Sequence, residues 1–157
     1  MMQREEPTKP VHESDDASAS EAQSTKDGID IPVIPDQGSA DELFRVGDKL
    51  LSLSKLALAK EAFRRALAVN GSQVSTLGRL GDVCVRLKEY EEAIGYYDRI
   101  GTLVEVKPAW LYVGLANAYE SLRQKESAIA NLRLALSLMR DSKVLRSRLD
   151  ALEATVS

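Results

Sequence analysis

The side chains that could act in catalysis or hold a metal are few in this chain of 157 residues. It contains one histidine, His12, and one cysteine, Cys84. A zinc site built from cysteine and histidine needs three or four such ligands, and a nucleophilic thiol needs a base beside it. The sequence has no glycine-rich phosphate motif, and carboxylates such as Glu91 and Glu92 fall on the surface of a predicted helix. This inventory predicts that the protein is not an enzyme and that it uses no metal and no cofactor.

The charge is divided unevenly along the chain. Residues 1–39 hold three basic and nine acidic side chains, whereas the remainder holds 18 basic and 15 acidic ones. A body with so small an excess of positive charge, without a basic stripe, does not predict nucleic-acid binding. No apolar run is long enough to span a membrane, and the first ten residues do not resemble a secretory signal. We therefore expect a cytoplasmic protein without a membrane span.

Residues 1–38 are predicted to be a disordered acidic tail. The segment is rich in Ser, Asp, Glu and Ala and has no aromatic residue, so it has little apolar surface to offset its ordering entropy. One apolar island interrupts it at residues 28–35, with Ile29, Ile31, Val33 and Ile34. The island is open to two interpretations: a linker, or a short segment that docks on the body. Docking in cis is expected near Phe44, because the connection to the first helix is only a few residues long.

The elements that must position any functional residue repeat at a fixed spacing. Gly47, Gly81 and Ala116 lie 34 and 35 residues apart, and similar patterns surround each of them: LFRVGDKL, LGRLGDVC and YVGLANAY. A second pattern follows in each unit: AKEAFRRAL, AIGYYDRI and AIANLRLAL. A period of this length is typical of a solenoid built from stacked units.

In these residues the chain resembles the tetratricopeptide repeat (TPR) family, with three repeats over about residues 40–73, 74–108 and 109–142. The resemblance implies an all-α, right-handed superhelical solenoid of antiparallel helix pairs. Its core positions are small or apolar in every unit, although the proline usual at position 32 is missing. They are Leu43, Val46, Gly47, Leu50, Ala59, Phe63 and Ala66 in the first unit; Leu77, Leu80, Gly81, Cys84, Ala93, Tyr97 and Ile100 in the second; and Tyr112, Leu115, Ala116, Tyr119, Ala128, Leu132 and Ala135 in the third.

Helix signals agree with this division. The pattern predicts helices over about 40–53, 56–69, 73–87, 90–103, 108–122 and 125–139. Ser39 and Glu42 have the spacing of a capping box, Asn70 and Gly71 are typical of a helix end, and Pro108 suits a first turn. Residues 143–157 carry a single apolar stripe at helical spacing, so they are predicted to form a capping helix that covers the last repeat.

The resemblance also implies that the first helix of each pair lines a concave groove that binds a peptide. The implied groove residues are Phe44, Arg45, Asp48, Arg79, Asp82, Arg86, Trp110, Gly114 and Asn117. In some relatives a Lys and an Asn in the first unit hold a terminal carboxylate. Phe44 and Asp48 stand at those positions here, which disfavours that mode. The arginines and aspartates suit a ligand of mixed charge, or they pair with one another.

Trp110 is the only tryptophan in the chain, and it falls at a groove position. Gly114 follows it by one helical turn and is interpreted as leaving an open space beside the indole for a ligand. Gly78 is open to that interpretation and to one in which it permits close packing of neighbouring helices. Tryptophan and arginine are enriched at binding hot spots.

Three functions are compatible with these features. The first is an adaptor or scaffold that holds a peptide or helix of another protein in its groove. The second is a bacterial secretion chaperone of the type III translocator kind, which the layout of a leading tail, three repeats and a last helix resembles. The third is a module that self-associates, for example as a homodimer through the N-terminal segment or the first repeat.

Overall fold

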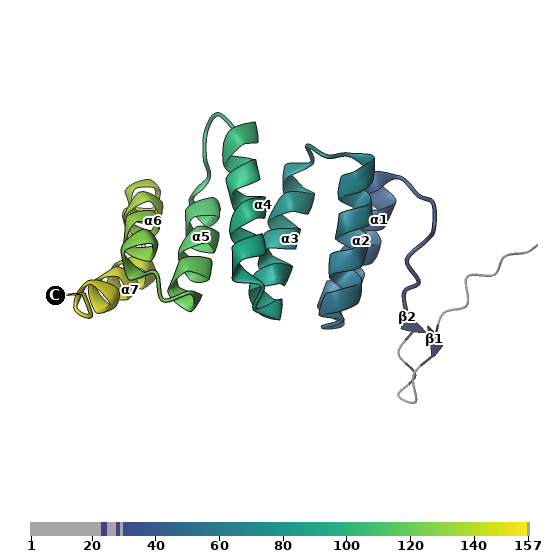
Figure 1. Cartoon of the computed structure of the whole chain (residues 1–157), viewed down its shortest axis with the longest axis horizontal. Coiled ribbons are helices and arrows are strands. Elements are labelled where there is room, and N and C mark those ends of the chain that lie inside the picture. The colour runs from purple at the N-terminus through teal and green to yellow at the C-terminus, as the bar shows by residue number, and fades with distance from the viewer. Residues whose placement is uncertain (1–22, 25–27, 29, 157) are drawn as a thin grey trace, which may run out of the picture.

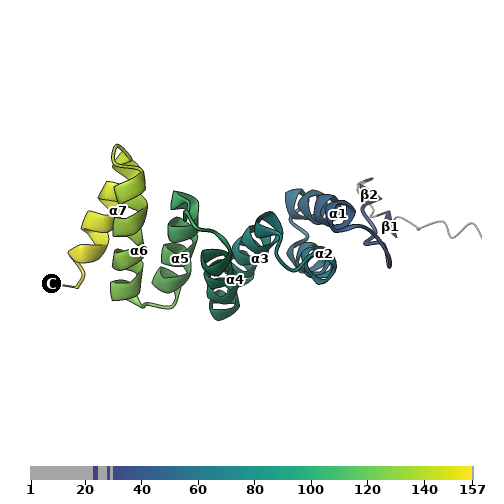
Figure 2. The same ribbon diagram turned by 90° about the horizontal axis from the view of Figure 1, so that it is seen from above.

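The computed structural model describes residues 23–24, 28 and 30–156. Within them, seven α-helices follow one another along the long axis of the molecule (Figure 1; seen from above in Figure 2). A pair of two-residue antiparallel strands, β1 (Gln23–Ser24) and β2 (Asp30–Ile31), lies at the N-terminal end. The helices are α1 (Ala40–Ser52), α2 (Leu56–Val69), α3 (Val74–Leu87), α4 (Tyr90–Leu103), α5 (Ala109–Ser121), α6 (Lys125–Leu138) and α7 (Lys143–Glu153).

The helix ends lie close to the predicted ones. The Ser39 hydroxyl accepts a hydrogen bond from the backbone N–H of Glu42 at 3.2 Å, which is one half of the predicted capping box. Pro108 lies one residue outside α5, at the N-cap, rather than inside its first turn. Helix α7 ends at Glu153 and is shorter than the predicted segment 143–157, because its last residues continue as a turn.

The turn between the two helices of each pair has the same backbone conformation in all three units, which the residue types do not predict. Ser54, Lys88 and Arg123 all have positive φ, between 56° and 66°. They lie 34 and 35 residues apart, so the same left-handed turn recurs in every unit. None of the three is a glycine, the residue that most often adopts this conformation. Gly71, which ends α2 in the sequence pattern, does not have a positive φ.

The core follows the repeat positions. All the predicted core residues are buried except Val46, Tyr112 and Tyr119, which are half-buried. The aromatic ring of the second helix of a pair lies on the small residue of the first. A Cβ atom added at Gly47 would lie 2.6 Å from Phe63, and one added at Gly81 would lie 2.5 Å from Tyr97. In the third unit Ala116 stands where the other two have glycine, and the facing position is occupied by the non-aromatic Leu132.

The described chain just before α1 packs on the first helix pair. Ile31 and Ile34 pack against the cluster formed by Leu50, Phe63 and their neighbours. The backbone oxygen of Pro35 accepts a hydrogen bond from Arg65 at 3.3 Å. The island therefore has enough apolar surface to dock in cis at the first repeat. The rest of the predicted tail, residues 1–22 and 25–27, lies outside the described residues, as does Ile29 of the island.

At the other end α7 packs on the third repeat. Leu145 and Leu149 are buried against Leu132 and Ile129 of α6, and Leu152 adds a partly buried contact. The same helix turns charged residues such as Arg146 and Asp150 to solvent. Among the described residues, no helix has the length and apolar character needed to cross a membrane.

Candidate functional site

The first helices of the three pairs, α1, α3 and α5, together line two neighbouring depressions. One has a volume of about 250 Å³ and lies between α1, α3 and α5. The other has a volume of about 390 Å³ and lies between α3, α5 and the end of α6. Trp110 and Asp82 line both, so the two depressions form one continuous groove. The first is lined by Phe44, Val74, Ser75, Gly78, Arg79, Asp82 and Trp110; the second by Asp82, Trp110, Val113, Gly114, Asn117 and Met139.

Trp110 is the central feature of this groove. Its side chain is 47% exposed, although it is the largest apolar group of the chain. The edge of the indole lies over Gly78 of α3: a Cβ atom there would be 3.4 Å from Cη2 and 3.5 Å from Cζ3. The contact therefore joins α5 to α3, the first helices of two successive pairs, and leaves about half of the side chain exposed at the groove.

Asp82 presents its carboxylate beside Trp110. Its Oδ1 atom accepts a hydrogen bond of 2.7 Å from the Tyr97 hydroxyl. Tyr97 is buried between α3 and α5, and burial together with this bond raises the pKa of its hydroxyl above the usual value. The phenol therefore stays protonated and acts as a fixed donor that positions the carboxylate. Within the described residues, no Lys or Arg forms an ion pair with Asp82, and no hydrogen bond reaches its Oδ2 atom.

The other charged groove residues divide into paired and unpaired ones. Arg79 pairs with Asp48 across α3 and α1, with 2.9 Å between Nε and Oδ1. The groove arginines and aspartates were expected either to bind a ligand of mixed charge or to pair with one another, and Arg79 and Asp48 pair with one another. Arg45 is exposed and bonds to the backbone oxygen of Asp41 in its own helix. Arg86 is exposed, and neither it nor Arg45 lines the two depressions.

Asn117 is oriented by the capping helix. Arg148 of α7 donates from Nη2 to Asn117 Oδ1 at 2.6 Å and from Nε to Glu120 Oε1 at 2.8 Å. Since a guanidinium only donates, the amide oxygen must face Arg148. The NH₂ group of Asn117 is then directed elsewhere, and no hydrogen bond from it is found within the described part of the chain.

The interpretation of Gly114 was wrong. A Cβ atom at this position would lie 2.7 Å from Cζ and 3.0 Å from Oη of Tyr97, so the space beside it is filled by the tyrosine ring. Gly114 lines the groove with its backbone, but it is a glycine because Tyr97 packs there. Gly78 lies against Trp110, but a Cβ atom there would be at an ordinary contact distance of 3.4 Å, so both of its interpretations remain predictions.

The repeat pattern missed two groove residues: Val74, in the smaller depression, and Met139, which follows the second helix of its pair. Met139 is the C-cap residue of α6 and 48% exposed, and it closes the far side of the larger depression. The sequence does contain a signal for Met139: a large apolar residue at the end of a helix, where the core does not require one, can indicate a binding surface. The pattern assigned the groove only to the first helices of each pair, so a residue from a second helix was not considered.

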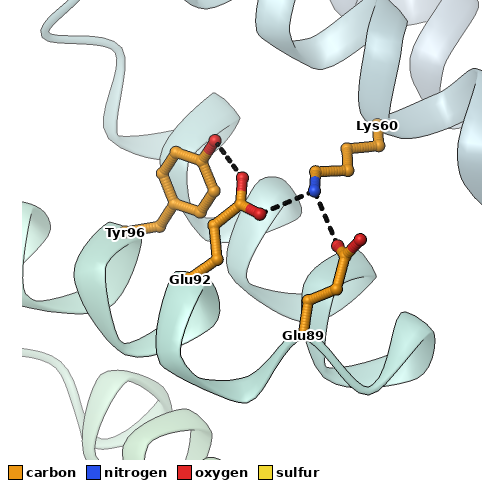
Figure 3. A network of polar contacts seen from close by, with 4 residues as sticks. All are labelled: Lys60, Glu89, Glu92 and Tyr96. Carbon is orange, nitrogen blue, oxygen red and sulfur yellow. Dashed lines mark hydrogen bonds and ion pairs between the residues drawn. The ribbon is translucent and has the colours of Figure 1, made fainter.

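A second polar cluster joins the first two repeats away from the groove (Figure 3). Lys60 of α2 donates from Nζ to Glu89 at 2.6 Å and to Glu92 at 2.7 Å, and the Tyr96 hydroxyl donates to Glu92 at 3.0 Å. Burial by itself would lower the pKa of Lys60, but its two carboxylate partners outweigh that effect and raise it. The hydrogen bond from Lys60 lowers the pKa of Glu92.

The thiol of Cys84 lies beside these two carboxylates, and the three ligand atoms are within 4.8 Å of one another. The lysine ammonium already supplies the positive charge between the carboxylates. Burial raises the pKa of the Cys84 thiol to about 12, so it is protonated near neutral pH. The arrangement is that of an ion-pair network between repeats rather than of a metal centre or a nucleophile.

A family model described as tetratricopeptide repeat matches residues 45–101, and a second with the same description matches residues 111–141. The chain belongs to the tetratricopeptide repeat family. A search of the curated proteins found no match.

Solved structures share the fold of this TPR domain. MamA from Desulfovibrio magneticus RS-1, residues 41 to the end, has a TM-score of 0.69 at 21% identity over 74% of this chain. This chain spans 65% of that structure. PcrH in complex with the chaperone-binding region of PopD, and the first TPR of Spaghetti (RPAP3) bound to an HSP90 peptide, each have a TM-score of 0.67 at 16% identity. Each alignment covers 74% of this chain, with 92% of PcrH and 94% of the RPAP3 domain. At these identities the likeness shows the fold alone.

Proposed function

We propose that this TPR domain is a protein-interaction module, an adaptor or scaffold that binds a segment of a partner protein along α1, α3 and α5. The observation that carries the proposal is the exposed Trp110 at the junction of two depressions. Large apolar side chains at the centre of a concave surface are typical binding anchors. The structures with PopD and HSP90 segments support the proposal, because they show that this fold accommodates chains from other proteins.

The groove suits an extended or helical segment rather than a small metabolite. Its two depressions are shallow and follow one another across three helices, from Phe44 to Met139. Its charges include Asp82 and the pair Arg79–Asp48, which does not favour a partner with a terminal carboxylate. The expected ligand is an internal stretch of a polypeptide with at least one apolar side chain for Trp110.

A dedicated secretion chaperone is the second candidate, favoured by the structural likeness to PcrH bound to PopD. An adaptor should bind a folded partner through a short peptide, whereas such a chaperone should keep an otherwise insoluble client in solution. Co-expression with clients encoded beside the gene distinguishes the two, because only a chaperone raises the soluble yield of its client. Self-association is a third candidate, and its test is the molar mass of the full chain by light scattering over a range of concentrations.

The experiment for peptide binding is selection from a displayed library of random peptides of about 12 residues, roughly 40 Å when extended. The full chain serves as bait, and every enriched peptide is kept, whether or not a Trp110→Ala variant also retains it. Affinities are then measured by anisotropy of labelled peptides. Trp110→Ala should weaken the selected peptides by about 2 kcal/mol or more, roughly thirtyfold.

A control removes an equally exposed apolar side chain outside the groove. Leu58 on α2 is 44% exposed, against 47% for Trp110, and it lines neither depression. Leu58→Ala should leave the affinities unchanged. If both variants bind the selected peptides as the natural chain does, or if no peptide depends on Trp110, the groove is not the binding site.

A further inference from the structure

We propose that the larger depression, between Trp110 and Met139, receives the side chain of a lysine or arginine of the bound segment. The inference rests on the proposed function and names the chemistry of its partner. Among the described residues that line this depression, Asp82 is the only charged one. A cationic side chain is complementary to that single carboxylate.

The carboxylate is available to such a ligand. Asp82 has no cationic partner within the described residues, in contrast to Asp48, which Arg79 occupies at 2.9 Å. The bond from Tyr97 engages Oδ1 at 2.7 Å and holds the side chain in place. Oδ2 is left to accept from a ligand. A charge-assisted hydrogen bond to a carboxylate that is already oriented loses little side-chain entropy on binding.

The apolar walls suit the stem of a long basic side chain. Trp110, Val113 and Met139 line the same depression as Asp82, and Trp110 and Met139 are each about half-exposed. Lysine and arginine place three or four methylene groups between backbone and charge, and these pack on apolar surface while the cation reaches a polar group. An indole face also attracts a nearby cation.

Asn117 adds a contact to the backbone of the same segment. Because Arg148 occupies its amide oxygen at 2.6 Å, its NH₂ group remains as a donor. A backbone carbonyl of an extended peptide is the natural acceptor for it. One carboxylate for the cation and one amide for the carbonyl would fix the direction in which the segment lies.

An acidic occupant fits this depression less well. The cation that lines the groove, Arg79, lies in the smaller depression and is paired, and Arg86 lines neither. The protein's own residues 1–39 hold nine acidic and three basic side chains, so they match Asp82 poorly. The occupant is therefore expected to be a basic segment of another chain.

The test is a double-mutant cycle on one selected peptide. Its lysine or arginine is replaced by norleucine, which keeps the apolar stem, and Asp82 is replaced by asparagine, which keeps the acceptor for Tyr97. The basic peptide should lose about fivefold to tenfold in affinity for Asp82→Asn, the range of a half-exposed charge-assisted bond. The norleucine peptide should bind both proteins equally. Asp98→Asn, which removes an exposed carboxylate of α4 outside the groove, should leave both affinities unchanged.

The outcomes separate this inference from the proposed function. If the selected peptides depend on Trp110 but contain no common basic residue, or if Asp82→Asn weakens basic and norleucine peptides alike, the cation pocket is refuted while peptide binding stands. If no peptide depends on Trp110, both fail. A wild-type comparison of the lysine, norleucine and glutamate peptides decides the point even if Asp82→Asn does not fold, since equal affinities for all three would refute the pocket.

Discussion

The tyrosine at the centre of the second repeat gives the sharpest test of the packing. Tyr97 of α4 lies between two glycines on different helices, Gly81 of α3 and Gly114 of α5. A Cβ atom at Gly81 would lie 2.5 Å from Cε1, and one at Gly114 would lie 2.7 Å from Cζ. Carbon atoms in good contact are about 3.5–4.0 Å apart, so each added methyl group overlaps the ring by about 1 Å.

The free energy of each change has two parts of opposite sign. Replacing a helical glycine by alanine stabilises by about 1 kcal/mol through helix propensity. Overpacking a core by a carbon atom costs about 1–3 kcal/mol. Gly95 of α4 supplies the reference, because a Cβ atom there meets nothing within 4 Å. The contribution of helix propensity is the same in all three variants and cancels in the comparison. The free energy of unfolding of Gly81→Ala and of Gly114→Ala should therefore each be about 1–3 kcal/mol lower than that of Gly95→Ala.

Urea unfolding of the full chain, followed by far-UV circular dichroism, measures these differences. A second set of variants assigns the cost to the ring. Tyr97→Leu removes the two closest atoms, Cε1 and Cζ, so in that background Gly81→Ala should cost no more than Gly95→Ala. The reasoning is refuted if Gly81→Ala is as stable as Gly95→Ala, or if its cost is the same with and without the tyrosine.

Three further predictions concern other parts of the fold. The hydrogen bond from Lys60, followed by that from Tyr96, lowers the pKa of Glu92 in the folded state. The stability that Glu92 contributes is therefore present above the ordinary pKa of a glutamate and is lost as the pH falls through the folded value, and Lys60→Met should remove most of this loss. A chain that begins at residue 28 should melt like the full chain, whereas one that begins at residue 39 should lose about 1–3 kcal/mol, because Ile31 and Ile34 no longer pack on the first repeat. The Cys84 thiol, buried and with its pKa raised to about 12, should react with a disulfide reagent at pH 8 only as fast as the protein unfolds.

Each of these has a control and a result that contradicts it. Lys49→Met, which removes an exposed lysine, should keep the acid dependence, and an unchanged dependence in Lys60→Met would show that the network does not set it. Equal melting of the two shortened chains would show that the docked segment contributes no stability. Rapid labelling of Cys84 without denaturant would show that the thiol is accessible in the folded protein.

The sequence alone was sufficient for the architecture. The positions of Gly47, Gly81 and Ala116 and of the residues that follow them predicted the three helix pairs, their core and the capping helix. These features are readable because burial requires apolar or small residues at the period of a helix, and the same requirement recurs in every unit. Ser39 and Pro108 located two helix starts to within a residue for the same local reason.

What the sequence could not determine is which side chains meet across the units. The spacing placed Asp48, Arg79 and Asp82 on one surface, but only the structure decided that the first two pair and that the third accepts a bond from Tyr97. Gly114 was misread because its neighbour comes from a different helix pair. The sequence left open whether Ile31 belongs to a linker or to a docking segment, and it did not place Met139 in the groove. The contact of Ile31 with the first repeat and the position of Met139 in the groove both depend on surfaces that exist only after folding. Helical periodicity assigns a residue to a face, whereas its partner on that face is set by the packing of helices that are distant in the chain.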